Sequence, residues 1–230
     1  MALYVLGDTH LSLGVSKPMD VFGGAWKDYV SKLRQGISTL KEEDVLVLAG
    51  DISWGMTLEE ALPDFQFLNE LPGQKWLLKG NHDYWWNTAG KMTSFFALHG
   101  LYKLHVLHNN CAFYGETALC GTRGWFFEEE KSGAHDEKVF RRELGRLEAS
   151  LKAAQGAAEI LVFLHYPPRY QGYACTEILE MLEQYQVKAC YYGHLHAGSH
   201  RLAIQGEYAG IDFRLIAADY INFAPFFIKE

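Results

Sequence analysis

Residues 45–51 read Val45-Leu46-Val47-Leu48-Ala49-Gly50-Asp51, a short apolar run that ends directly in a glycine and a carboxylate. An apolar run of this length without polar alternation is typical of a strand that is buried on both faces of a sheet. Comparable runs, most of them nearly all apolar, occur at 2–6, 75–79, 160–164 and 188–192. We therefore expect a core strand at each of these places.

Helical patterns separate several of these runs. Apolar residues keep helical spacing over 26–40 and again over 139–151. Segment 57–71 opens with a capping-box candidate, although Pro63 within it would kink the helix or delay its start. The alternation of strands and helices predicts an α/β fold.

Shorter strand patterns occur in two further regions. Segments 103–107, 111–114 and 117–121 predict short strands with hairpin-like connections, and 201–218 predicts two or three more. These patterns favour a second, partly antiparallel sheet. The chain shows no internal repeat, low-complexity tract or linker-like stretch, so we expect one domain over residues 1–230.

The charge balance narrows the range of partners. The 230-residue chain carries 21 Lys and Arg against 28 Asp and Glu, which gives a formal net charge of −7. A general nucleic-acid-binding protein carries a basic stripe, and this composition disfavours nucleic acid as a partner. Bound cations would reverse the potential locally, so a nuclease is disfavoured without being excluded.

The cysteines and the apolar runs indicate a cytoplasmic protein with no membrane partner. Cys111, Cys120, Cys175 and Cys190 lack CxxC spacing and are expected to be free thiols in a reducing compartment, with a disulfide pair left open. The N-terminus lacks the charged region and long apolar stretch of a signal peptide. No apolar run approaches the 18 residues of a membrane span.

Five short polar motifs follow the apolar runs in a fixed order. They are Asp8-Thr9-His10, Gly50-Asp51, Gly80-Asn81-His82-Asp83, His165 and Gly193-His194-Leu195-His196. Because ligands bind beyond the carboxyl ends of strands in open α/β sheets, we expect these residues to converge. Their oxygen and imidazole donors are the types that form a paired divalent-metal centre, and a carboxylate such as Asp51 can bridge two cations.

With all five motifs intact and in order over residues 7–197, the chain resembles the calcineurin-like metallophosphoesterases. The resemblance implies a four-layer αββα sandwich of two mixed β-sheets flanked by helices, with two metal ions at the strand ends. Transferred position by position, it implies that Asp8, His10 and His196 hold one metal, that Asn81, His165 and His194 hold the other, and that Asp51 bridges them.

The resemblance also implies roles beside the metals. His82 would face the scissile phosphate ester and stabilise or protonate the leaving oxygen, and Asp83 would orient His82 or support the loop. The mixed carboxylate, amide and imidazole donors suit two divalent ions of Mn, Fe or Zn better than Ca²⁺. We expect a metal-bound hydroxide to attack the phosphorus while the metals absorb charge.

The expected function is that of a metal-dependent phosphoric ester hydrolase, acting on a small phosphomonoester or phosphodiester. Residues 50–55 lack the acid and arginine of the protein serine/threonine phosphatase motif, which disfavours a phosphoprotein substrate. Trp54 replaces the tyrosine of purple acid phosphatases, so we do not expect their ferric centre. A nuclease and a non-catalytic metal-binding scaffold with the same fold remain the alternatives. The residues do not indicate the oligomeric state.

Two candidate substrate contacts and one candidate lid lie outside the metal motifs. Arg123, in a loop between two glycines, could bind phosphate oxygens, with a surface ion pair as the alternative. Tyr84 belongs to an aromatic run that could stack on a nucleobase, although core packing is more frequent for such residues. The polar stretch 126–138 is a lid or, preferably, a solvated loop.

Overall fold

The computed structural model describes residues 1–125 and 134–230, and these residues contain two large β-sheets. The first sheet has five strands in the order β13-β1-β2-β3-β4, in which β13 is antiparallel to β1 and the other neighbours are parallel. Its strands are β1 (Leu3–Leu6), β2 (Val45–Ala49), β3 (Gln74–Leu78), β4 (Leu104–Val106) and β13 (Phe226–Lys229).

The second sheet has six strands in the order β11-β12-β10-β7-β6-β5. Its four central strands are parallel, and β11 and β5 run antiparallel at the two edges. The strands are β5 (Cys111–Tyr114), β6 (Thr117–Thr122), β7 (Glu159–Leu164), β10 (Ala189–Tyr192), β11 (Gly206–Tyr208) and β12 (Ile211–Leu215). The sheet is therefore partly antiparallel, as the strand patterns predict.

Helices and short turns connect these strands. The α-helices are α1 (Tyr29–Ile37), α2 (Leu58–Glu70), α3 (Ala89–Leu98), α4 (Ala134–Lys152) and α5 (Thr176–Gln184). The smaller elements are the 3₁₀ turns η1 (Asp20–Phe22), η2 (Gly24–Trp26) and η4 (Ala197–Leu202), and the hairpin of β8 (Arg169–Tyr170) and β9 (Tyr173–Ala174). Within the described residues, no helix is both long and apolar enough to cross a lipid bilayer.

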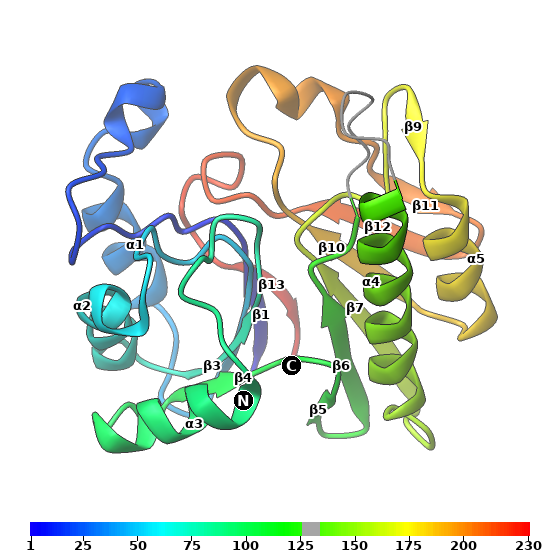
Figure 1. Ribbon diagram of the computed structural model, residues 1–230, viewed down its shortest axis with the longest axis horizontal. Coiled ribbons are helices and arrows are strands. Elements are labelled where there is room, and N and C mark those ends of the chain that lie inside the picture. The colour runs from blue at the N-terminus through cyan, green and yellow to red at the C-terminus, as the bar shows by residue number, and fades with distance from the viewer. Residues whose placement is uncertain (126–133) are drawn as a thin grey trace.

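The two sheets pack face to face between two layers of helices (Figure 1). Helices α1, α2 and α3 cover the outer face of the first sheet, and α4 and α5 cover the outer face of the second. A third buried cluster, which includes Val47 and Phe163, fills the space between the sheets. This arrangement confirms the expected four-layer αββα sandwich of two mixed sheets.

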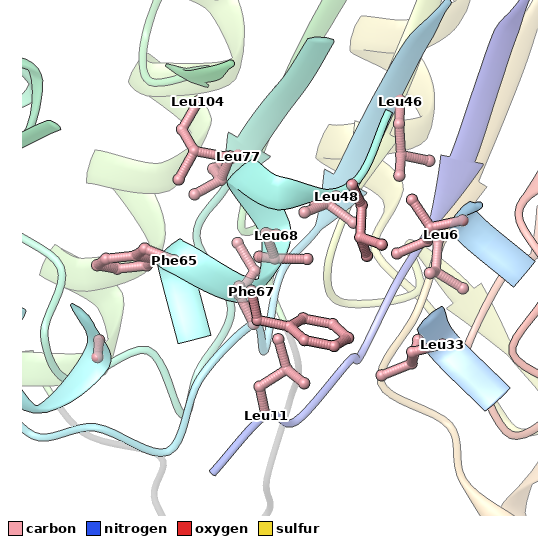
Figure 2. Close-up of a cluster of buried hydrophobic side chains, with 14 of the residues drawn as sticks. Leu6, Leu11, Leu33, Leu46, Leu48, Phe65, Phe67, Leu68, Leu77 and Leu104 are labelled. Carbon is pink, nitrogen blue, oxygen red and sulfur yellow. The ribbon is translucent and has the colours of Figure 1, made fainter. Parts of the chain in front are cut away.

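The apolar run at 45–49 shows why a strand of this fold carries no polar residue. Val47 and Ala49 belong to the cluster between the sheets, whereas Leu46 and Leu48 belong to the cluster beneath the helices. Successive side chains of a strand point to opposite faces, so both sets are buried. Figure 2 shows Leu46, Leu48 and Phe67 of α2 in the buried cluster of this layer.

Of two predicted helices, one differs from the sequence pattern at its N-terminus and the other agrees with it. The apolar spacing over 26–40 predicts a longer helix than α1, which starts at Tyr29 because Asp28 adopts a left-handed conformation with φ of 54°. Helix α2 starts at Leu58, so Pro63 does not delay it. The Thr57 side chain accepts a hydrogen bond from the Glu60 N–H at 3.2 Å, which confirms the N-terminal cap.

Several elements carry no signal that we used for prediction. Helices α3 and α5, the β8–β9 hairpin and strand β13 are additions to the predicted set. All four cysteines lie in the described part of the chain and are free thiols. Cys111 and Cys120 are opposite each other on the neighbouring strands β5 and β6 but form no disulfide. Of the polar stretch 126–138, considered as a lid or a solvated loop, residues 126–133 lie outside the described residues and residues 134–138 form the start of α4.

A buried lysine should give the stability of the fold a distinctive pH dependence. The Lys75 ammonium is fully buried and donates hydrogen bonds to the carbonyls of Leu71 and Gly73. Burial, with a smaller effect of Lys103, lowers the pKa of Lys75 from 10.5 to about 7. Between these pH values the unfolded chain holds a proton that the folded chain lacks, so the free energy of unfolding rises with pH.

We expect this rise to disappear in Lys75→Met. Urea denaturation at pH 7.5 and pH 9.5 should show that wild type gains stability relative to the variant at the higher pH. The exposed Lys188 provides the control, because Lys188→Met should differ from wild type by the same amount at both pH values. An unchanged difference for Lys75→Met would mean that the buried ammonium keeps its proton throughout.

Candidate metal centre

The carboxyl ends of β1 and β12 meet, and this contact joins the two sheets at the edge where the motifs lie. The Gly7 N–H donates to the Ile216 carbonyl at 2.9 Å, and the Ala218 N–H donates to the Gly7 carbonyl at 3.0 Å. Beside it, the Asp8 N–H donates to the Gly50 carbonyl at 2.9 Å. These backbone hydrogen bonds hold the loops after strands of both sheets together, so residues far apart in the sequence can share one site.

Backbone conformation directs the motif side chains into this edge. Asp8, His10, Asp51 and His194 all have positive φ, with values of 59°, 45°, 49° and 71°. A positive φ is uncommon for residues other than glycine and costs energy, and such residues cluster at functional sites. Four of the seven predicted ligands thus adopt a backbone conformation that is uncommon for residues other than glycine.

One group of donors combines residues from both sheets. One ligand atom from each of Asp8, His10 and His196 lies within 4.8 Å of the other two. The two Nε2 atoms of His10 and His196 are 3.3 Å apart, and His196 Nε2 is 3.4 Å from Asp8 Oδ1. Asp51 Oδ2 lies 3.7 Å from His10 Nε2, so this carboxylate borders the group.

A second group includes Asp51 itself. Ligand atoms of Asp8, Asp51 and His165 also lie within 4.8 Å of one another. His165 Nε2 is 3.5 Å from Asp51 Oδ2 and 2.6 Å from Asn81 Oδ1. The ring of His194 packs against that of His165 with centroids 5.1 Å apart, and its backbone N–H donates to Asp8 at 3.1 Å. His194 is therefore adjacent to the second group without belonging to its compact set.

Two glycines allow the loops to approach this closely. A Cβ at Gly80 would lie 2.1 Å from the backbone nitrogen of Asp51, and a Cβ at Gly193 would lie 2.2 Å from Asp8 Oδ2. Any side chain at either position would push a predicted ligand away. The first residues of the Gly-Asn-His-Asp and Gly-His-Leu-His motifs must therefore be glycine, because no side chain fits there.

The electrostatics of the centre suit cation binding. Burial, together with neighbouring histidines, lowers the pKa of His10 and His165 well below the usual range, and that of His194 to about 3, so these rings are neutral donors at pH 7. Burial lowers the pKa of His196, but the Asp8 carboxylate and the hydrogen bond to Asp219 outweigh it and raise the value to about 10. Burial, with the neighbouring Asp83 and Asp8, raises the pKa of Asp51 well above its usual range, an effect that a bound cation would reverse. The mixed oxygen and nitrogen donors fit a pair of divalent cations.

His82 borders this centre and is partly exposed. Its backbone N–H donates to Asp51 Oδ1 at 2.7 Å, and its half-buried ring lies 4.5 Å from that of Trp54 and 6.0 Å from that of His10. Burial, with a contribution from Lys17, lowers the pKa of His82. Its Nδ1 lies 3.4 Å from the hydroxyl of Tyr84, a residue that is 54 % exposed and hence accessible to a substrate.

The neighbouring Asp83 is fully buried and supports two loops. Its carboxylate accepts hydrogen bonds from the N–H groups of Ile52 (2.8 Å) and Gly80 (2.7 Å), and from Trp85 Nε1 (3.1 Å). These donors belong to the loops after β2 and β3. The geometry thus fits the loop-support alternative better than orientation of the His82 ring.

Arg123 forms an ion pair beside the second donor group. Its guanidinium lies 3.4 Å from the buried Glu143 carboxylate and 5.8 Å from the centre of the Tyr166 ring. That ring in turn packs against His194, with centroids 4.6 Å apart. The Tyr166 ring therefore contacts both Arg123 and His194. The ion pair of Arg123 is with a buried carboxylate, unlike the surface ion pair considered as the alternative to phosphate binding.

One acid next to the predicted ligands, Asp219, lies outside the five motifs. Asp219 Oδ1 lies 2.8 Å from His196 Nδ1. The signal was present in the sequence, because Asp219 follows the apolar stretch that ends at Ala218 just as Asp8 and Asp51 follow theirs. Trp54 is a second addition, since its ring stacks on His10 at 5.0 Å.

Comparison with known proteins agrees with this geometry. The chain belongs to the calcineurin-like phosphoesterase family, whose family model matches residues 1–198. It is therefore a metal-dependent phosphoric ester hydrolase, as the resemblance implies.

Solved structures share the fold at low sequence identity. A phosphopantetheinyl hydrolase from Mycobacterium tuberculosis matches with a TM-score of 0.60 and 12 % identity over 99 % of this chain and 95 % of that chain. A protein of unknown function from Aquifex aeolicus matches with a TM-score of 0.51 and 14 % identity over 98 % and 95 %. No sequence among curated proteins matches the chain significantly.

Proposed function

We propose that the protein uses two divalent cations to hydrolyse a small phosphomonoester or phosphodiester. The observation that carries this proposal is the pair of donor groups that share Asp8 and border the same Asp51 carboxylate. Two adjacent groups around one carboxylate match the requirement of two-metal hydrolysis, in which the ions sit about 3.5–4 Å apart.

In this proposal each ion takes ligands from both sheets. Asp8, His10 and His196 would hold one ion, Asn81, His165 and His194 would hold the other, and Asp51 would contribute to both. We favour Mn²⁺, Fe²⁺ or Zn²⁺ because the donors combine carboxylate, amide and imidazole. When bound, the ions lower the pKa of a water molecule toward about 7 and neutralise charge on the phosphoryl oxygens.

The remaining residues act on the ester. His82 donates a hydrogen bond from Nε2 to the leaving oxygen, while its Nδ1 is within reach of the Tyr84 hydroxyl. Tyr84, being exposed beside His82, contacts the leaving group. Asp83 keeps the loops after β2 and β3 in register, and Arg123 contributes positive charge at the far side of Tyr166.

Hydrolysis of two chromogenic esters tests the reaction class. We expect turnover of p-nitrophenyl phosphate or bis-p-nitrophenyl phosphate in the presence of Mn²⁺, loss of turnover after chelation, and recovery when the metal is returned. Preference for one ester assigns the protein as a monoesterase or a diesterase.

The same assay addresses the non-catalytic alternative. If neither ester is hydrolysed with Mn²⁺, Fe²⁺ or Zn²⁺, the chain is a scaffold that keeps the family fold. Metal analysis of the purified protein accompanies the assay, because two ions per chain without turnover would separate metal binding from catalysis.

A further inference from the structure

Asp219 lies outside the 1–198 stretch that the family model matches, yet it contacts the centre directly. Its side chain is only 1 % exposed. One carboxylate oxygen, Oδ1, lies 2.8 Å from His196 Nδ1, and the other, Oδ2, accepts the Ala197 N–H at 3.0 Å. His200 Nε2 approaches Oδ2 at 3.2 Å.

We propose that Asp219 is a positioning residue that holds His196 in the form that binds a metal ion, an inference that rests on the proposed function. A buried carboxylate beside Nδ1 favours a proton on that nitrogen, so the proton that a metal ion displaces is the one on Nε2, and the lone pair is then on Nε2. Nε2 is the atom that faces the other donors, at 3.4 Å from Asp8 and 3.3 Å from His10. Histidine ligands are commonly oriented in this way by a carboxylate outside the metal's own ligands.

The same carboxylate also fixes the backbone that carries His196. Ala197 has a left-handed conformation with φ of 47° and begins the 3₁₀ turn η4. The hydrogen bond from the Ala197 N–H to Asp219 compensates for the strain of that conformation. Asp219 directly follows the segment that forms backbone hydrogen bonds with Gly7. Its side chain therefore connects the His196 ring and the turn η4 to the edge where the two sheets meet.

An alternative use of these residues is a third cation bound by His196, His200 and Asp219, whose ligand atoms lie within 4.8 Å of one another. We favour the hydrogen-bonded arrangement because both carboxylate oxygens already face N–H donors. A cation at that position would require His196 to lose the Nδ1 proton and bridge two metal ions.

Substitution of Asp219 by asparagine tests the proposal through metal affinity. The carboxamide has one acceptor oxygen for the two donors of His196 and Ala197, and its NH₂ group would face the other donor. We expect one of the two Mn²⁺ ions to bind about 10–100-fold more weakly, as measured by competition with a chelator, and the other to bind as in wild type. Excess Mn²⁺ should restore activity.

Asp212→Asn is the matched control, because Asp212 is an aspartate of β12 that pairs with the exposed Arg214. It should leave both affinities unchanged. Equal affinities in wild type and Asp219→Asn would overturn the proposal, as would three ions in wild type that fall to two in the variant. Failure of wild type to bind Mn²⁺ would instead contradict the proposed function.

A measurement on the unaltered chain keeps the proposal testable if Asp219→Asn does not fold. Long-range ¹H–¹⁵N correlation of the Zn²⁺-loaded protein should show the His196 proton on Nδ1. A proton on Nε2, or none on the ring, would overturn the assignment of Asp219 as the group that orients His196.

Discussion

Asp51→Asn is expected to lose metal ions from both sides of the centre and to reduce turnover by more than about 100-fold. Loss of a residue outside the ligand set costs roughly 10–100-fold, and Asp51 borders both donor groups, so its effect should be larger. The amide has almost the same shape but carries no charge to hold two cations. It also has a single acceptor for the His82 N–H, which now donates to Oδ1 at 2.7 Å.

Metal content and kcat of Asp51→Asn should be measured on the same preparation. Asp44→Asn is a suitable control, because Asp44 is also buried and precedes β2 at the opposite end from Asp51, where it accepts the Ala2 N–H at 2.7 Å. That control should lower stability while the metal content stays at the wild-type level. Full metal content in Asp51→Asn would remove the bridging role.

His82→Ala is expected to keep both metal ions and to lose about 10²–10⁴-fold in kcat. The ring contributes no ligand atom to either donor group and borders the centre through Trp54 and His10. Because its proposed task is to stabilise the leaving oxygen, the loss should be larger for an alkyl phosphate than for p-nitrophenyl phosphate, whose leaving group needs less assistance.

The comparison of these two esters distinguishes the proposed role from a general disturbance of the site. His105→Ala provides the control, since His105 is also half-buried but contacts Gln74 on the first sheet. It should behave as wild type with both esters. An empty centre in His82→Ala would show that the imidazole supports metal binding, and an equal loss with both esters would argue against assistance to the leaving group.

Much of the fold follows from local signals in the sequence. Strand β2 occupies the predicted 45–49 because an uninterrupted apolar run can only be buried on both faces. Strand β13 carries no comparable signal, because it is an edge strand that pairs with β1, at the other end of the chain. The start of α1 was missed for a different reason, because the left-handed turn at Asp28 interrupts an otherwise helical pattern.

The candidate site could likewise be predicted only in part. Donor types and their order could be predicted, because each motif directly follows a strand. The function of Asp219 could not, since its contact with His196 depends on the hydrogen bonds that bring Gly7 beside Ile216 and Ala218. The ion pair of Arg123 with Glu143 likewise depends on the packing of α4 against the second sheet.

The contact between β1 and β12 has a consequence for the whole molecule. Asp8 and His10 extend from the first sheet and His196 extends from the second. Likewise, Asn81 follows a strand of the first sheet and His165 follows a strand of the second. Ions bound there would therefore cross-link the two halves of the sandwich at their shared rim, and ligand binding to the native state adds to its stability. Loading with metal would then make the whole chain more resistant to unfolding, as well as complete the centre.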